Sequence, residues 1–204
     1  MLRNRQALIP YLLLVAALAG GLLWHQSEQV PGLGKTVITG RADVGGPFRL
    51  IDHTGKQVTD ADFRGRYMLI YFGYSYCPDV CPTTLAVMAQ ALEKLGGKSQ
   101  RIVPILITID PERDTPKVLA EYVKAFGPSF VGLTGSEAAI KDAEKKYRVY
   151  AVKKPLDPSK GSGGNYGVDH SSVLYLMGPD GRLVNFYDEA ISPDDLAKDL
   201  RQRT

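Results

Sequence analysis

Cysteine is scarce in this chain of 204 residues, in which only Cys77 and Cys81 are present. A secreted fold built on disulfides needs more cysteines, spread along the chain, and a zinc site of four sulfurs needs twice as many. Both classes are therefore excluded. A disulfide between residues four apart would close so small a ring that it removes little entropy from the unfolded chain. The pair therefore indicates a redox or metal site rather than a structural crosslink.

Long runs of basic residues are also missing. The chain has 25 Lys and Arg against 22 Asp and Glu, and no stretch of five or more basic residues. The electrostatic footprint of a nucleic-acid-binding protein is therefore absent, and we expect no nucleic-acid partner. The composition, 44% hydrophobic and 23% charged, is typical of a globular protein. The length suits one domain of ordinary size and a short additional segment.

An apolar run at residues 7–24 covers eighteen positions without a charge. At a rise of 1.5 Å per residue a helix of this length spans about 27 Å, just enough to cross the hydrocarbon core of a membrane. Arg3 and Arg5 precede the run, and none of the ten residues after it is Lys or Arg. The positive-inside rule then predicts that residues 1–6 stay in the cytoplasm and that the rest is exported.

A cleaved signal peptide is the alternative, because Ala17-Leu18-Ala19 fits the small-x-small rule for a cleavage site. The apolar run continues past that site, so we expect an uncleaved, single-pass anchor in the inner (cytoplasmic) membrane. We expect a linker over residues 25–40 and one domain over residues 41–204 on the periplasmic side.

Predicted strands and helices alternate along the exported part. The runs 67–74 and 102–109 are apolar throughout, which is typical of strands buried on both faces. Gly178-Pro179-Asp180-Gly181 predicts a hairpin turn between strands at 173–177 and 183–187. The other predicted elements are a hairpin of 48–52 with 57–58, helices at 83–95, 115–126 and 136–147, a short strand between the last two of these helices, a strand at 149–153 and a last helix after Ser192. This order favours an α/β fold with one mixed sheet and helices on both faces.

The cysteine pair lies between the predicted strand that ends near Tyr74 and the helix that begins near Thr83. The free N–H groups and positive dipole at a helix N-terminus favour a thiolate over a thiol. The spacing of four puts both sulfurs on one side of a helical turn, so that they can share one ion or oxidise together. Two thiolates suit Cu(I), and an added imidazole gives a set that can also hold Cu(II). Metal binding and redox chemistry both remain open here.

Three histidines are available as a third ligand. His25 and His53 are expected to be surface residues. His170 follows a glycine-rich segment and precedes a predicted strand, and a loop of that kind can carry a side chain onto a distant site. From the residues alone, a surface histidine and a metal ligand both remain open. Asp169 either orients the imidazole of His170 or simply lies in the turn.

The segment 109–116 also has two interpretations. Asp110 ends a predicted strand, and Thr115 followed by Pro116 is a good start for a helix. Arg113 then pairs locally. Alternatively, Asp110 and Arg113 belong to a loop beside the site that contacts a partner.

Three motifs, in this order along the chain, resemble those of the Sco/SenC family. They are Tyr-Cys-Pro-Asp-Val-Cys-Pro-Thr at 76–83, Ile-Asp-Pro-Glu-Arg-Asp-Thr-Pro at 109–116 and Val-Asp-His-Ser at 168–171. The resemblance covers roughly residues 48–200. Members of the family are thioredoxin-like copper chaperones that help to assemble the dinuclear copper centre of cytochrome c oxidase. The resemblance implies a thioredoxin-like fold, a membrane anchor, and Cys77, Cys81 and His170 as ligands of Cu(I) and Cu(II).

The resemblance implies a metallochaperone that delivers copper to the copper-site subunit of cytochrome c oxidase. A periplasmic copper donor and a thiol reductant are further expected partners. Two other functions stay open: a thiol–disulfide oxidoreductase that reduces the cysteines of the oxidase copper site, and a copper or redox sensor that acts on a membrane partner. Because chaperone and reductase both need reactive thiolates, the sequence leaves open whether the protein is an enzyme.

Overall fold

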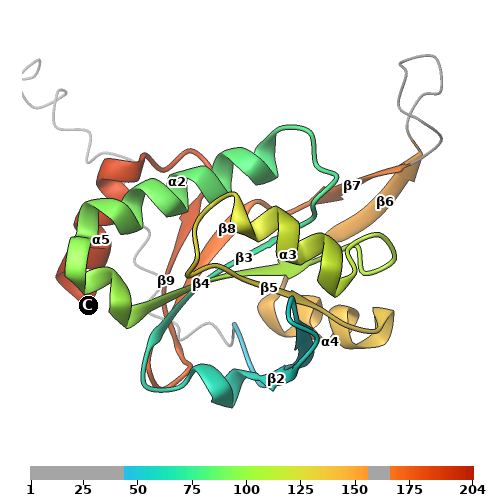
Figure 1. The fold of residues 1–204 in the computed structure, drawn as a ribbon, viewed down its shortest axis with the longest axis horizontal. Coiled ribbons are helices and arrows are strands. Elements are labelled where there is room, and N and C mark those ends of the chain that lie inside the picture. Colours follow the sequence, from blue (N-terminus) through green and yellow to red (C-terminus); the bar gives the residue numbers. More distant parts are fainter. Residues whose placement is uncertain (1–43, 156–165) are drawn as a thin grey trace, which may run out of the picture. The chain divides into compact units, whose positions relative to one another are not determined.

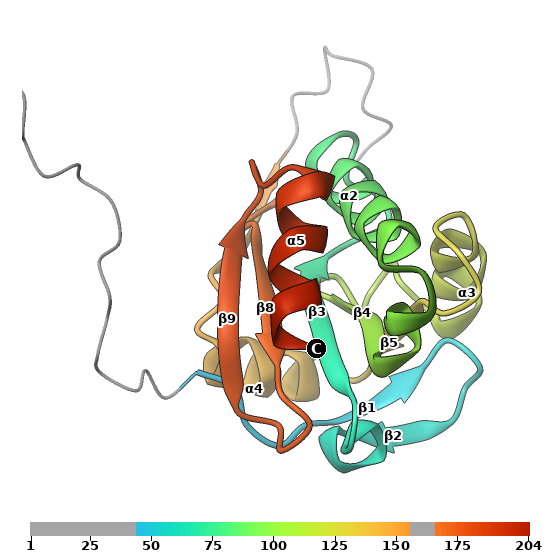
Figure 2. The same ribbon diagram turned by 90° about the vertical axis from the view of Figure 1, so that its left-hand side faces the viewer.

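The computed structural model describes residues 44–155 and 166–204, and Figures 1 and 2 show their fold from two sides. The strands are β1 (Arg49–Asp52), β2 (Gln57–Thr59), β3 (Tyr67–Gly73), β4 (Ile102–Thr108), β5 (Val131–Thr134), β6 (Ala151–Pro155), β7 (Tyr166–His170), β8 (Val173–Met177) and β9 (Leu183–Asp188). The helices are α2 (Val80–Leu95), α3 (Pro116–Lys124), α4 (Glu137–Tyr147) and α5 (Pro193–Arg203), with short 3-10 helices η1 (Asp60–Phe63) and η2 (Gly96–Arg101).

Seven strands form one sheet in the order β2-β1-β5-β4-β3-β8-β9. β3, β4 and β5 are parallel to one another, whereas β8 is antiparallel to β3 and β9 is antiparallel to β8. β1 is antiparallel to both β5 and β2. β6 and β7 pair antiparallel in a separate two-stranded sheet. The predicted mixed sheet is confirmed.

Helices cover both faces of the large sheet, which is also as predicted. α2, α3 and α5 lie on one side and α4 lies on the other (Figure 1). The crossovers that contain α2 and α3 move in the same direction along the sheet, so right-handed connections place both helices on one face. In β3 the side chains alternate accordingly. The Tyr71 hydroxyl reaches Cys81 in α2, and the Phe72 ring packs 5.3 Å from the ring of Tyr147 in α4.

The central strands β3 and β4 position the candidate site. All residues of β4, and all of β3 except Tyr67, are buried, as their continuous apolar sequences predict. Both strands run in the same direction, so Gly73 and Thr108 end them at the same edge of the sheet. The cysteine segment follows β3 and the segment with Asp110 follows β4. Sites of open α/β sheets lie at this carboxyl edge.

Some elements differ from the sequence prediction. β5 is the short strand predicted between the second and third helices, whereas β7 was not predicted, and α2 begins at Val80 rather than near Pro82 or Thr83. His170 ends strand β7 and does not lie in a flexible loop. His53 is half-buried rather than fully exposed, and its Nδ1 accepts a hydrogen bond from the backbone N–H of Gly132 at 3.1 Å.

No helix among residues 44–155 and 166–204 is both long enough and apolar enough to cross a membrane. The predicted anchor at residues 7–24 lies outside the described residues, as do the predicted cytoplasmic residues 1–6, the linker at 25–40 and His25.

Candidate metal centre

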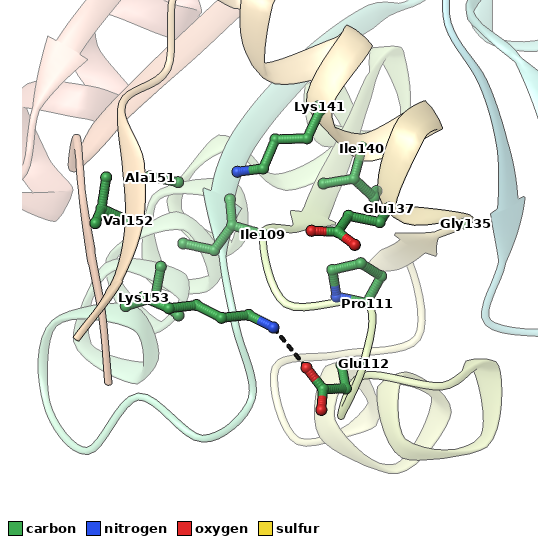
Figure 3. Close-up of a pocket in the computed structure, with 11 residues that line it drawn as sticks. Ile109, Pro111, Glu112, Gly135, Glu137, Ile140, Lys141, Ala151, Val152 and Lys153 are labelled. Atoms are coloured by element: carbon green, nitrogen blue, oxygen red, sulfur yellow. Dashed lines mark hydrogen bonds and ion pairs between the residues drawn. The ribbon is translucent and has the colours of Figure 1, made fainter. Parts of the chain in front are cut away.

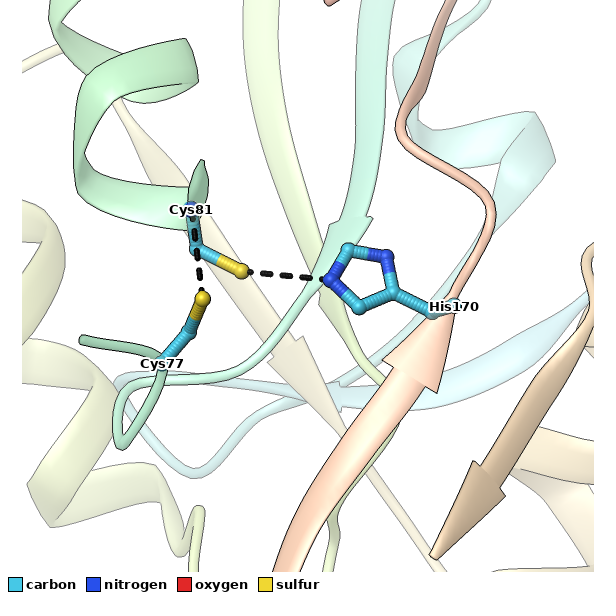
Figure 4. A group of neighbouring side chains, drawn as sticks. All are labelled: Cys77, Cys81 and His170. Atoms are coloured by element: carbon cyan, nitrogen blue, oxygen red, sulfur yellow. Dashed lines mark hydrogen bonds between the residues drawn. The ribbon is translucent and has the colours of Figure 1, made fainter. Parts of the chain in front are cut away.

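The two cysteines lie at the junction between β3 and α2 (Figure 4). Cys77 is half-buried in the connecting loop, Cys81 is fully buried in the first turn of α2, and both are free thiols. The backbone N–H of Cys81 donates to the Cys77 sulfur at 3.3 Å. Asp79, which precedes the helix, makes no capping bond with its side chain. The Cys77 sulfur therefore accepts from the helix N-terminus, where a capping oxygen is common.

His170 completes a group of three potential ligands. Its Nε2 lies 3.5 Å from the Cys81 sulfur, and the ligand atoms of Cys77, Cys81 and His170 all lie within 4.8 Å of one another. The Nδ1 of His170 is 3.1 Å from the carbonyl oxygen of Ser171. Because a carbonyl oxygen only accepts, Nδ1 donates to Ser171, and Nε2 is the ring nitrogen that faces the sulfurs. Nε2 is therefore the atom through which His170 would bind a metal held by the sulfurs.

The small sheet of β6 and β7 determines where His170 lies. His170 is paired with Ala151, at the end of β7 that is nearer to the cysteines. Successive side chains of a strand point to opposite sides, so the buried Val168 and His170 share one side. Asp169 is exposed on the other side, where it forms an ion pair with Lys154. The imidazole is therefore oriented by the Ser171 carbonyl rather than by Asp169.

Two tyrosines of β3 and the loop after it surround the imidazole. The rings of Tyr71 and Tyr74 each lie 6.0 Å from the His170 ring in edge-on contacts. The Tyr71 hydroxyl donates to the Cys81 sulfur at 3.7 Å, and the Tyr74 hydroxyl accepts from the backbone N–H of Val168 at 3.2 Å. From the sequence, these tyrosines were predicted only as part of a buried strand. Tyr71 and Tyr74 are three residues apart, whereas side chains on one side of a strand recur every two residues. This spacing is the one sequence signal that could have set them apart from the other residues of the strand.

Gly73 permits the close approach of these groups. A Cβ atom at this position would lie 3.0 Å from the Cys81 sulfur and 2.7 Å from a carbon of the Tyr71 ring. The distance to the ring carbon is shorter than real Cβ atoms show and the distance to the sulfur is unusually tight, so a larger residue would displace the ring and press on the sulfur. No role for Gly73 was predicted from the sequence, because a glycine that ends a strand usually marks only a turn.

The two thiols differ strongly in acidity. The hydrogen bond from the Cys81 thiol is the main cause that lowers the pKa of Cys77 to about 3, and the His170 ring and the N–H groups of the helix N-terminus add to it, against the effect of burial. The same sulfur–sulfur hydrogen bond, together with burial, raises the pKa of Cys81. Without a metal, the site thus presents a half-exposed thiolate at Cys77 above a buried thiol at Cys81.

Asp110 and Arg113 lie beside this group but do not belong to it. The fully buried carboxylate of Asp110 pairs with Nε of Arg113, whose side chain is only 16% exposed. The Arg113 guanidinium carbon lies 3.9 Å from the Tyr166 ring centre and 4.9 Å from that of Tyr76. Little of either charged side chain is therefore available to a partner, and local pairing describes both residues better than a partner contact.

A cavity of about 560 Å³ lies close to this segment, and none of the three potential ligands lines it (Figure 3). Its walls come from the segment after β4, from α4 and from β6, and the ion pair of Lys153 with Glu112 spans one side at 2.5 Å. The cysteine and histidine group is thus separate from this cavity.

A sequence model of the SCO1/SenC family matches residues 36–204. The chain belongs to the SCO1/SenC family. It is 45% identical over 195 residues to Protein sco1 of Schizosaccharomyces pombe, which covers 92% of this chain and 73% of that protein. It spans about half the length of the mitochondrial SCO1 homologues of Arabidopsis thaliana and human, with 49% and 53% of their chains covered.

Solved structures of SCO1/SenC proteins have the same fold. Arabidopsis thaliana ScoI with copper bound has a TM-score of 0.73 and 42% identity, covering 78% of this chain and 96% of that one. BsSco, described as a member of the Sco family of cytochrome c oxidase assembly proteins and as having a disulfide switch, has a TM-score of 0.62 and 27% identity, with 79% and 94% covered. The prediction of a thioredoxin-like Sco/SenC domain is confirmed.

Proposed function

We propose that this protein is a copper chaperone that binds Cu(I) and Cu(II) through Cys77, Cys81 and His170 and delivers copper to the dinuclear copper centre of cytochrome c oxidase. The observation that carries the proposal is the meeting of two sulfurs and an imidazole Nε2 within 4.8 Å. Soft thiolates select Cu(I), and a set of two sulfurs and one nitrogen also suits Cu(II). Relatives with copper bound, and the description of BsSco as belonging to a family of oxidase assembly proteins, support the cargo and the partner.

The unequal exposure of the two sulfurs suits transfer. Cys77 is half-buried and Cys81 is fully buried. An incoming thiolate of the oxidase subunit can therefore replace Cys77 first, while Cys81 and His170 retain the ion until a second ligand of the partner arrives. Tyr76, which is 60% exposed next to Cys77, offers an aromatic contact surface at this entry point.

The test is a transfer experiment with the copper-loaded domain and the metal-free, reduced copper-site domain of the oxidase subunit. We expect copper to leave the chaperone and the spectrum of the dinuclear copper centre to appear in the oxidase domain. The same mixture without copper, but with the oxidase cysteines oxidised, measures reductase activity. Copper that stays on the donor, together with rapid reduction of the oxidised target, would contradict the chaperone function.

Thiol–disulfide reduction is the second candidate, and the lowered pKa of Cys77 favours it. The Cys77 thiolate would attack a disulfide of the oxidase subunit and form a mixed disulfide with it. Cys81, after losing its proton, would then attack the Cys77 sulfur, so that the target leaves as a dithiol and the pair is left as a disulfide. This route oxidises the domain once for each target and needs a thiol reductant to restore it.

We also propose that residues 7–24 anchor the domain in the inner membrane, with residues 1–6 in the cytoplasm and the copper site on the periplasmic side. The charge-free length of the run and the positions of Arg3 and Arg5 support this orientation. A topology reporter fused after Thr204 is expected to be active only outside the cytoplasm, and the purified chain is expected to retain Met1 or Leu2. Cytoplasmic reporter activity would contradict the orientation, whereas a mature N-terminus at Gly20 would replace the anchor with a signal peptide.

A further inference from the structure

The segment 110–114, called the bracket below, contributes no ligand to the candidate metal centre and yet contacts both halves of it. One half is the cysteine loop, residues 74–77, and the other is the histidine strand β7. We infer that the bracket fixes the distance between these two halves, so that Arg113 and Asp114 are positioning residues for copper binding. This inference rests on the proposed copper site and adds to it the residues that assemble the site.

The cysteine loop is bound by Asp114. Its carboxylate is fully buried and accepts hydrogen bonds from the backbone N–H of Ser75 at 3.0 Å and from the Ser75 hydroxyl. It also accepts from the Thr108 hydroxyl, at the end of β4, at 2.6 Å. Ser75 is two residues before Cys77. One buried carboxylate thus ties the backbone of the cysteine loop to the neighbouring strand of the sheet.

The histidine strand is bound by Arg113. The Nη1 of its guanidinium donates to the carbonyl oxygen of Tyr166 at 3.0 Å, and the guanidinium lies against the Tyr166 ring. Tyr166 is the first residue of the strand that ends in His170. The guanidinium also contacts the cysteine loop, since its carbon lies 4.9 Å from the centre of the Tyr76 ring. A planar, stacked guanidinium makes all these contacts at once.

The bracket is held in place by hydrogen bonds of its own. The backbone N–H groups of Arg113 and Asp114 both donate to the carbonyl oxygen of Asp110, at 3.2 and 2.9 Å. The backbone N–H of Asp110 is bound by the Thr108 hydroxyl at 2.9 Å, and the Asp110 carboxylate accepts from the Tyr166 hydroxyl at 2.8 Å. The bracket is therefore attached to β4 at one end, and its two functional side chains leave it in fixed directions.

The experiment compares Arg113→Lys and Asp114→Ala with wild type in the affinity for Cu(II) and Cu(I), measured separately. Lys keeps a charge for the buried Asp110 carboxylate but lacks the fork and the stacking plane that reach Tyr166. Loss of a group that orients a ligand typically costs about 10- to 100-fold in metal affinity. We expect Arg113→Lys to weaken Cu(II) binding in this range and Cu(I) binding much less, because Cu(I) can remain on the two sulfurs.

Asp114→Ala releases the cysteine loop and so displaces the sulfurs. We therefore expect it to weaken the binding of both Cu(I) and Cu(II). Asp114→Asn should recover most of the affinity, because its amide oxygen can still accept from the Ser75 N–H while its NH₂ group donates to the Ser75 hydroxyl. Glu112→Gln is the matched control. Glu112 belongs to the same segment, and its exposed carboxylate pairs with Lys153 and accepts a hydrogen bond from the Tyr166 hydroxyl at 3.2 Å. The amide oxygen of glutamine can still accept that hydrogen bond, so copper affinity should not change.

A double-mutant cycle decides whether Arg113 acts through His170. In a His170→Ala background, Arg113→Lys should no longer change the residual Cu(II) affinity. In the copper-free protein, NMR contacts between the rings of His170 and Tyr71 should be strong in wild type and reduced in Arg113→Lys. An equal loss of Cu(II) affinity with and without His170, or unchanged ring contacts, would overturn the inference. If Arg113→Lys does not fold, Tyr166→Leu removes the ring that lies against the guanidinium, although not the backbone carbonyl, and the same results are expected of it.

The copper affinities and the ring contacts test the role of the bracket and the proposed function separately. A wild-type domain that binds no copper would contradict the chaperone function, while the ring contacts of the copper-free protein would still support or overturn the role of the bracket.

Discussion

Cys81→Ser is expected to lower the Cu(I) affinity of the domain by more than the roughly 10- to 100-fold that loss of an outer-shell partner costs. The fully buried Cys81 sulfur is one of only two soft ligands, and a hydroxyl does not replace a thiolate for Cu(I). Serine nearly preserves the shape of the side chain, so the melting temperature of the copper-free domain should change little. The measurement is a competition titration of the reduced domain against a Cu(I) chelator of known affinity.

Cys81→Ala provides the matched comparison, because it removes the hydrogen bond as well as the ligand. The Cys81 thiol is the main cause of the lowered pKa of Cys77. A serine hydroxyl can donate in its place, but alanine cannot, so the pKa of Cys77 should rise toward the free-thiol value only in Cys81→Ala. A thiolate with a higher pKa is lost at a higher pH. Alkylation of Cys77 between about pH 5 and 8 should therefore slow as pH falls in Cys81→Ala and stay constant in wild type and Cys81→Ser.

Two results would contradict this description of the pair. The first is a Cu(I) affinity in Cys81→Ser that matches wild type, which would mean that Cys81 is not a ligand. The second is the same pH profile of alkylation in Cys81→Ala and in wild type, which would assign the acidity of Cys77 to the helix N-terminus and not to the sulfur–sulfur hydrogen bond.

His170→Ala is expected to abolish the sulfur-to-copper charge-transfer absorption of the Cu(II) form and to weaken Cu(I) binding much less. The imidazole Nε2 faces the Cys81 sulfur at 3.5 Å and is the nitrogen in the ligand group, whereas Cu(I) can rest on two thiolates. The thiols should keep their reactivity toward disulfides, because that chemistry requires only the sulfurs. Spectra of the two copper forms and a thiol-exchange assay on the same sample measure both effects.

His53→Ala is the control for this substitution. His53 is also a half-buried histidine with one ring nitrogen in a hydrogen bond, but its partner is the Gly132 backbone, in β5. Its removal should leave both copper spectra unchanged. A similar loss of the Cu(II) absorption in both variants would indicate general damage to the fold rather than loss of a ligand.

The central strands of the fold could be predicted because their sequences are compatible only with burial on both faces of a sheet. β3 and β4 are apolar throughout, and a strand of that kind must be covered on both faces. β5 was predicted only as a short strand without bounds, because it has four residues and includes Gly132, whose lack of a side chain makes room for Leu119 and Val123 of α3. Such a strand is specified by the helix that packs on it rather than by its own pattern.

The two cysteines of the ligand group could be predicted from the local sequence, whereas the histidine could not. The cysteine pair is local, and its place before a helix already indicates reactive thiolates. His170 is 89 residues from Cys81, and its position follows from the pairing of β6 with β7, which no local pattern predicted. The family resemblance supplied the assignment of His170 that the residue alone left open.

The surroundings of the site could not be predicted, because they depend on contacts between distant segments. A partner contact by Asp110 and Arg113 stays an alternative to local pairing until their burial is known. Asp169 precedes His170 in sequence, but its side chain pairs with Lys154 on the other side of β7. The contacts of Tyr74 with Val168 and of Asp114 with Ser75 join parts of the chain that are 94 and 39 residues apart.

The most direct measurement is oxidase assembly in cells whose only copy of this protein carries His170→Ala, beside cells with wild type and with Cys81→Ser. This variant keeps the sulfur chemistry and lacks the third ligand, so it separates copper delivery from disulfide reduction. We expect a strong loss of copper in the oxidase and of oxidase activity in the two variants, although the chains reach normal levels. Full assembly with His170→Ala would contradict delivery of copper from the three-ligand site, and the reductase function would then replace it.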